Sequence, residues 1–299
     1  MTVLRYTHGM GGDPIVIREL TRAQWPEGLS EIPDPPKKLW LTGEMPPKEH
    51  KLLTVVGSRM YTGYGRDACE HFIAGLAGYP VSIVSGLALG IDGIAHRAAL
   101  KVGLHTVAIP GSGLGERVLY PATHRRLARE IVTQGGALLS EYEPEFKATR
   151  WSFPQRNRLM AGIAHATLII EASTKSGTLI TARMVADYNR ELLVVPGSIF
   201  SKNSEGPHLF MKLGATPVTC AEDILAAVGI EAARQSRAAD LSALPSDHRK
   251  LLDLLTEPRS KNTLIEVLDM SPATVSGMLM ELELQGYVVE RNGLIRRSI

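Results

Sequence analysis

An aromatic ring and two arginines lie within six residues of one another, at Phe153, Arg156 and Arg158. Guanidinium groups bind anions through several N–H donors, and an aromatic ring stacks on flat groups. Further along the chain, an apolar run leads into Ser176-Gly177-Thr178, which is typical of a helix start. Free N–H groups and the helix dipole at such a start favour phosphate. These features together predict an anionic, flat ligand, and single-stranded nucleic acid is such a ligand.

Each of these residues also has a simpler interpretation. Phe153 is a core residue if its segment is buried, but its polar neighbours favour an exposed ring that stacks on a ligand. Arg156 and Arg158 cannot both be buried without partners, although one of them can form a structural ion pair. We expect a short helical run to follow these arginines and to lead into the next strand.

Short apolar runs rich in β-branched residues alternate with helical stretches through the central part of the chain, which predicts a parallel sheet with helical crossovers. The predicted strands are Leu52–Val56, Val81–Val84, His105–Ile109, Ala137–Leu139, Ala166–Ile170, Leu192–Val195 and Pro217–Thr219. Nearly every strand ends in small or polar residues. Because ligands of open α/β sheets bind at the carboxyl ends of the strands, we expect the site at that edge.

Other motifs allow competing interpretations. Arg59 follows the first strand, where it either faces an anion or is an ordinary surface arginine. The run Gly63-Tyr-Gly65-Arg-Asp-Ala68 only partly fits a dinucleotide fingerprint, and no Walker A pattern occurs, so we expect no cofactor.

Asp92 and His96 are spaced as metal ligands or an acid–base pair, but a local hydrogen bond is the favoured interpretation. No catalytic constellation stands out, which favours a binding protein over an enzyme.

Composition limits the class of protein. The apolar fraction of 44% is typical of a globular chain with a sizeable core. Two distant cysteines, Cys69 and Cys220, cannot form a disulfide framework or a multi-cysteine metal site. With no visible signal peptide and no apolar run long enough to cross a membrane, we expect a cytoplasmic protein. Residues 51–228 hold 18 Lys and Arg against 14 Asp and Glu, a net charge of +4, which hints at polyanion binding there.

Domain organisation follows from changes in pattern. We interpret residues 1–50, which are rich in proline, as an extended lead-in packed on a main domain of residues 51–228. Residues 229–245 form an alanine-rich linker. Residues 246–299 show three helical stretches and a hairpin around Asn292-Gly293, which predict a winged helix-turn-helix. The candidate recognition helix, SPATVSGMLMELELQG, has no Lys or Arg, so protein contact or autonomous packing is favoured over DNA reading.

Several segments, in this order, resemble the DNA-processing protein A (DprA/Smf) family of bacterial single-strand DNA-binding proteins. The resembling segments are VVGSR (55–59), SGLALGIDGIAHRAAL (85–100), PGSGL…YP (110–121), LLSEY (138–142), FPQRNRLMAG (153–162), EASTKSGTLITA (171–182), VVPGS (194–198) and LGA (213–215), and the lead-in WPEGLSEIPDPPKKLWLTG (25–43) also fits. The resemblance implies an extended Rossmann-like domain that binds single-stranded DNA without cutting it. It also implies dimerisation, and protection and delivery of incoming DNA to the RecA recombinase in natural transformation.

The resemblance and the strand ends together define the predicted single-strand DNA site. Its residues are Gly57, Ser58, Arg59, Ser85, Gly86, Gly111, Ser112, Gly113, Arg150, Phe153, Arg156, Asn157, Arg158, Glu171, Lys175, Ser176, Gly177 and Thr178. The chain departs from the family pattern at His124 and His208, where asparagine is usual. The alternative is a LOG-type nucleotide phosphoribohydrolase, although the PGGxGTxxE pattern of those enzymes is not reproduced. No metal or cofactor is expected.

Overall fold

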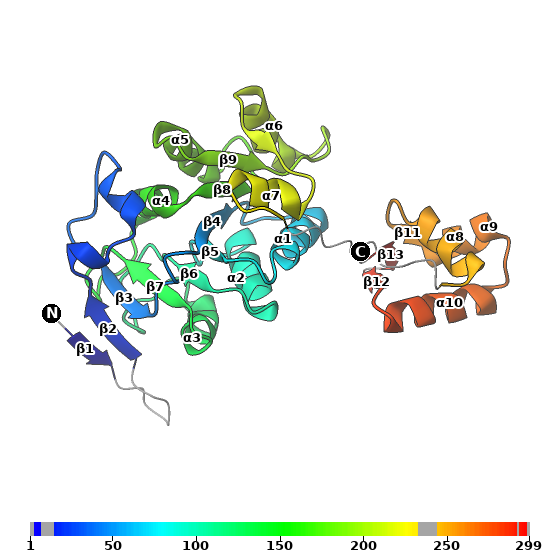
Figure 1. The fold of residues 1–299 in the computed structure, drawn as a ribbon, viewed down its shortest axis with the longest axis horizontal. Helices are drawn as coiled ribbons and strands as arrows, with labels where there is room; N and C mark the ends of the chain where they lie inside the picture. Colours follow the sequence, from blue (N-terminus) through cyan, green and yellow to red (C-terminus); the bar gives the residue numbers. More distant parts are fainter. Residues whose placement is uncertain (1–2, 7–14, 233–243, 292, 298–299) are drawn as a thin grey trace. The chain divides into compact units, whose positions relative to one another are not determined.

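The computed structural model describes residues 3–6, 15–232, 244–291 and 293–297. The chain divides at residue 232 into two compact units, a sheet unit and a smaller C-terminal unit (Figure 1). Most of the predicted linker and Asn292 of the predicted hairpin turn lie outside the described residues. None of the helices in the described ranges is long and apolar enough to cross a membrane.

The sheet unit is built on a ten-stranded sheet whose strand order is β1-β2-β3-β7-β6-β5-β4-β8-β9-β10. The strands from β4 onward are parallel to one another. They are β4 (Lys51–Val56), β5 (Val81–Ser85), β6 (Thr106–Ala108), β7 (Ala137–Ser140), β8 (Ala166–Ile169), β9 (Glu191–Val194) and β10 (Thr216–Pro217). The chain proceeds from β4 toward β7 and then returns to β8 on the other side of β4. The strand order therefore reverses between β4 and β8, which is where open α/β sheets bind ligands.

Helices cover both faces of this sheet (Figure 1). They are α1 (Gly63–Gly75), α2 (Ile91–Lys101), α3 (Arg125–Thr133), α4 (Ser152–Ile163), α5 (Thr178–Asp187), α6 (Glu205–Lys212) and α7 (Ala221–Ala227). Alternation along β4 separates the two cores, because successive side chains point to opposite faces. Leu53 and Val55 pack with α1, α2 and α7, whereas Leu52 and Val56 pack with α4, α5 and α6. The predicted α/β fold class is confirmed.

The lead-in adds antiparallel strands that the sequence did not reveal. They are β1 (Val3–Tyr6), β2 (Ile15–Glu19) and β3 (Trp40–Gly43), and β3 pairs with β7. Between β2 and β3 the chain forms two short 3₁₀ turns, and Trp25, Leu29 and Ile32 pack there into the core beside α4. The lead-in is therefore continuous with the sheet unit in both hydrogen bonding and packing.

The C-terminal unit has the three helices and the hairpin that the sequence predicts. Its elements are α8 (Ser246–Leu254), β11 (Arg259–Ser260), α9 (Lys261–Leu268), α10 (Pro272–Leu284), β12 (Val288–Arg291) and β13 (Leu294–Arg297). The Ser271 hydroxyl caps α10 by accepting from the Thr274 N–H at 3.1 Å, with Pro272 at the first helical position. Leu251, Val275 and Leu282 belong to its own buried core, which confirms a small winged-helix unit.

Candidate nucleic-acid interface

A cavity of about 820 Å³ lies at the carboxyl ends of β4, β5 and β8. Its place coincides with the reversal of strand order between β4 and β8. Ten of the eighteen predicted site residues line it: Gly57, Ser58, Arg59, Phe153, Arg156, Asn157, Lys175, Ser176, Gly177 and Thr178. The fold thus brings three segments that are distant in sequence to one concave surface.

Phe153 provides the aromatic surface of this cavity. The ring is half-buried in the first turn of α4, and the Arg59 guanidinium carbon lies 5.7 Å from its centroid. On another side, the Tyr120 ring centroid is 5.5 Å from that of Phe153. Gly111 lets the ring lie against the backbone, since a Cβ there would be 2.6 Å from a Phe153 ring carbon. A cation and a flat ring are therefore presented together.

Arg156 lies in the floor of the cavity. Its Nη1 donates to the carbonyl of Gly86 at 2.5 Å and to the carbonyl of Ile109, and a Cβ on Gly86 would collide with the guanidinium. The buried Asp92 carboxylate accepts from the N–H groups of Gly86 and Ala88 at 3.1 and 3.3 Å. Arg156 therefore ties α4 to the loops that follow β5 and β6, while Asp92 holds the first of those loops.

Burial dominates the electrostatics of this floor. It raises the pKa of Asp92, and the nearby Arg156 charge opposes the effect. It lowers the pKa of Arg156 to about 10, against the attraction of Asp92, so this guanidinium remains charged at neutral pH. The local hydrogen bond favoured for Asp92 and His96 does not form: Asp92 accepts from the β5–α2 loop instead, and His96 Nδ1 lies 2.8 Å from the hydroxyl oxygen of Thr106.

The Ser176-Gly177-Thr178 turn brings a helix start to the cavity, as predicted. Helix α5 begins at Thr178, whose N–H donates to the Ser176 hydroxyl at 3.2 Å. The Thr178 hydroxyl donates to the carbonyl of Gly57 at 3.3 Å, which joins this turn to the loop after β4. With Lys175 beside it, the turn presents positive charge and a helix dipole to an anion.

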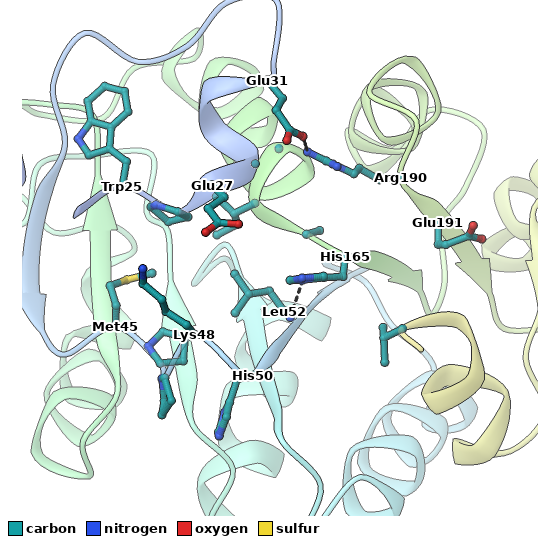
Figure 2. Close-up of a pocket in the computed structure, with 18 of the residues that line it drawn as sticks. Trp25, Glu27, Glu31, Met45, Lys48, His50, Leu52, His165, Arg190 and Glu191 are labelled. Carbon is teal, nitrogen blue, oxygen red and sulfur yellow. Dashed lines mark hydrogen bonds and ion pairs between the residues drawn. The ribbon is translucent and has the colours of Figure 1, made fainter. Parts of the chain in front are cut away.

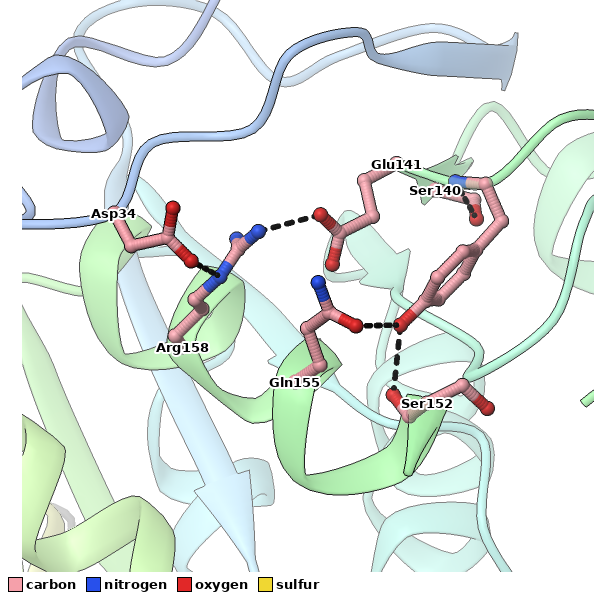
Figure 3. A network of polar contacts seen from close by, with 7 residues as sticks. Asp34, Ser140, Glu141, Ser152, Gln155 and Arg158 are labelled. Atoms are coloured by element: carbon pink, nitrogen blue, oxygen red, sulfur yellow. Dashed lines mark hydrogen bonds and ion pairs between the residues drawn. The ribbon is translucent and has the colours of Figure 1, made fainter. Parts of the chain in front are cut away.

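Arg158 lies on another side of α4 (Figure 3). Its Nη2 is 2.5 Å from Glu141 Oε2 and its Nε is 3.2 Å from Asp34 Oδ2. Burial raises the pKa of Glu141, and the Arg158 charge opposes that rise. The expected helical run already begins at Ser152 and contains both arginines. Because residues two apart in a helix lie on different sides of it, the two side chains point in different directions. Both arginines are buried with partners, and only Arg156 reaches the cavity.

The remaining predicted residues surround the cavity without lining it. The Ser85 hydroxyl donates to the carbonyl of Val55, and the Ser112 hydroxyl donates to that of Gly113. Glu171 is buried, and its carboxylate accepts from the N–H and hydroxyl of Thr62 at the start of α1. The loop that holds Ser112 is joined to the end of β7 by the Ser140 hydroxyl, which donates to the carbonyl of Ser112 at 2.8 Å. Gly86 and Gly111 lie against Arg156 and Phe153, respectively. Arg150 is exposed just before α4.

Some lining residues were not selected from the sequence. Lys202, Asn203 and Glu205 follow β9, and Asn203 Nδ2 donates to the carbonyl of Met60 at 2.8 Å. The sequence signal for them is the small-residue run Pro196-Gly197-Ser198, which directly follows the strand Leu192–Val195 and lies outside the predicted site. Within the described ranges, no three His, Cys, Asp or Glu side chains are grouped to hold a metal ion.

A second cavity, of about 590 Å³, lies at the opposite, amino ends of β4 and β8 (Figure 2). Trp25, Met45 and Lys48 line it together with His165, whose Nδ1 accepts from the Leu52 N–H at 3.0 Å. Burial lowers the pKa of His165, helped by nearby positive charges. None of the predicted site residues borders this cavity.

Comparison with known families accounts for most of the chain. The family model for DNA recombination-mediator protein A matches residues 17–229, and that for the DprA winged helix domain matches residues 235–293. The chain belongs to the DNA-processing protein A family. The resemblance stated from the sequence is therefore confirmed, and the cavity lies in the part that the first model covers.

Relatives in this family include Protein Smf of Escherichia coli, which is 41% identical over 67% of this chain and 53% of its own length. DNA processing protein DprA of Streptococcus pneumoniae is 39% identical over 68% of this chain and 70% of its own length. Its crystal structure superposes with a TM-score of 0.66, covering 73% of this chain and 75% of that chain at 36% identity. The structure of DNA processing protein A of Helicobacter pylori superposes with a TM-score of 0.62 at 29% identity, covering 70% of this chain and 94% of that chain. The chain spans about half the length of Protein Smf.

Proposed function

We propose that this protein binds single-stranded DNA in the cavity at the carboxyl edge of its sheet. The observation that carries the proposal is the placement of the Arg59 guanidinium over the Phe153 ring inside that cavity. One nucleotide offers a phosphate to the cation and a base to the ring. The structure of the Helicobacter pylori relative was described for its single-stranded DNA binding mode, which supports the same ligand here.

The cavity favours single strands over duplexes. Phe153 is half-buried and its ring faces a concave space, so only a base free of its pairing partner reaches it. Lys175 and Lys202 also line the cavity, and α5 begins directly after the loop that carries Lys175. These groups hold phosphates without reading sequence, which suits a protein that accepts any strand.

The cellular role is proposed from family membership. We infer that the protein protects incoming DNA and loads RecA recombinase in natural transformation, as a homodimer in the cytoplasm. We infer binding without catalysis, because Asp92 and Glu171, the buried carboxylates nearest the cavity, are already held by backbone and side-chain hydrogen bonds. Neither is arranged as an acid–base pair with His96, which bonds to Thr106 instead.

A gel-shift titration with matched single- and double-stranded oligonucleotides tests the proposal. We expect the single strand to bind more tightly, with an affinity that falls as salt rises. Incubation with AMP provides the enzymatic comparison, and we expect no free adenine. Equal affinity for both DNA forms, or release of adenine at a catalytic rate, would contradict the proposed function.

A further inference from the structure

Exposed apolar side chains of the sheet unit are concentrated at the edge that holds the cavity. Twelve large hydrophobic residues are exposed among the described residues of that unit, and nine of them follow the carboxyl ends of strands or begin the next helix. Water-exposed rings and methyl groups are unfavourable, so such a concentration marks a binding surface. The most exposed aromatic residues in this group are Trp151, at 84%, and Phe200, at 91%.

These two rings flank the cavity. Trp151 follows β7 and directly precedes α4, two residues before Phe153. Phe200 follows β9 and comes two residues before Lys202, which lines the cavity. In the strand order β7-β6-β5-β4-β8-β9 the two rings lie on loops at opposite ends. Five strand spacings separate those ends, which is about 24 Å.

Positive charge accompanies each ring. The exposed Arg150 precedes Trp151, and Lys202 lies close to Phe200 in sequence. An apolar protein partner would not require a cation beside each exposed ring, whereas a chain of phosphates and bases matches both groups. The aromatic surface is also continuous toward the cavity on one side, because Tyr120 contacts Phe153 there.

We propose that Trp151 and Phe200 are two further stacking positions for a single DNA strand, one on each side of the central cavity. This inference rests on the proposed function. The strand crosses the carboxyl edge of the sheet from the loop after β7 to the loop after β9. Its middle nucleotide occupies the Arg59–Phe153 cavity, and flanking bases stack on the outer rings.

Intrinsic fluorescence tests the Trp151 position directly. The chain has three tryptophans, and Trp25 and Trp40 are buried at 7% and 2% exposure, so Trp151 is the one tryptophan on which a base can stack. We titrate the full protein with oligothymidylates of about four and about sixteen nucleotides, the range of site sizes for single-strand binding folds. We expect the longer strand to quench the emission, and the variant Trp151→Ala to lose that quenching.

Affinity measurements complete the test. Trp151→Ala and Phe200→Ala should each weaken binding of the longer strand about 5- to 150-fold, as loss of one stacked base predicts. Binding of the short strand should stay within about twofold. Trp151→Phe should restore most of the affinity, because it keeps a ring. Leu213→Ala, at a residue 71% exposed beyond the far end of α6, is the matched control and should change neither affinity.

The outcomes separate the two proposals. If wild type binds neither oligonucleotide, the proposed function and this inference both fail. If wild type binds both strands, yet emission is unchanged and the outer variants bind the longer strand normally, the outer positions are refuted while the central site stands. If Trp151→Ala or Phe200→Ala weakens both strands equally, that ring acts on the cavity itself, which also refutes a separate stacking position.

Discussion

The Arg59 guanidinium lies over the Phe153 ring, 5.7 Å from its centroid, although Arg59 follows β4 and Phe153 begins α4. The two side chains meet where the strand order reverses, so each depends on the fold for its position. Their separate contributions to binding can be measured, because one supplies charge and the other a flat surface.

Replacing Arg59 tests the charge. Arg59→Glu should weaken single-strand binding strongly and reduce the salt slope by about one, because one phosphate contact is lost. Titration at several salt concentrations measures both effects. Lys212→Glu, with the same change of charge on the exposed last turn of α6, is the control. A wild-type slope and affinity for Arg59→Glu would place Arg59 outside the site.

Replacing Phe153 tests the flat surface. Phe153→Ala should cost about 1–3 kcal/mol of binding free energy if one base stacks on the ring. The ring is half-buried, so some folding stability is lost as well. Affinity and melting temperature measured on one sample separate the two effects. A large drop in melting temperature with unchanged affinity per folded molecule would reject stacking.

The sequence predicts the sheet more closely than it predicts the directions of the side chains on α4. β-branched runs marked β4 to β9 to within a residue or two, because buried parallel strands are continuously apolar. The strands β2 and β3 were missed because prolines and 3₁₀ turns interrupt the pattern between them. Arg156 and Arg158 were both assigned to the cavity because the segment was not recognised as helical. Once α4 is placed from Ser152, their spacing alone requires different directions.

Arg158 is expected to act on stability. Its side chain and that of its partner Glu141 are only 7% and 8% exposed. Arg158→Ala leaves a buried carboxylate unpaired and should cost about 3–5 kcal/mol of unfolding free energy. Chemical denaturation measures the loss, and the salt slope of DNA binding should remain that of wild type. A reduced slope with normal stability would instead assign Arg158 to a phosphate.

Buried His96 should make the fold sensitive to acid. Burial lowers the pKa of His96 to about 3, whereas an unfolded histidine titrates near 6.5. The unfolded state therefore binds the proton first, and unfolding free energy falls as pH decreases between those values, by at most about 1.4 kcal/mol per unit. Denaturation at several pH values should show a shallower fall for His96→Gln.

The exposed His71 on α1 supplies the matched control for that experiment. His71→Gln should retain the acid dependence of wild type, because it replaces an exposed side chain and leaves the buried imidazole of His96 in place. An unchanged pH dependence for His96→Gln, in a protein that still folds, would show that another group causes the acid sensitivity.

The winged-helix unit is predicted to be dispensable for most of the single-strand affinity. Its residues 246–299 carry 7 Lys and Arg against 8 Asp and Glu. On α10, Glu281 Oε2 lies 2.9 Å from Nε2 of His248 on α8. Leu279 and Leu282 of the same helix are buried in the unit's own core. A chain ending at residue 232 should stay folded and keep most of its affinity in a gel shift. A folded truncated chain that has lost nearly all binding would move the principal site to the tail.

Helix α4 faces two structures at once. Phe153, Arg156 and Asn157 line the cavity, while Arg158 forms ion pairs with Glu141 and with Asp34 of the lead-in (Figure 3). Loss of the Arg158 contacts should therefore loosen the attachment of α4 to the lead-in and to the loop after β7, and with it the helix that lines the cavity. A genetic selection for lost DNA binding should therefore also recover substitutions at Glu141, which does not line the cavity.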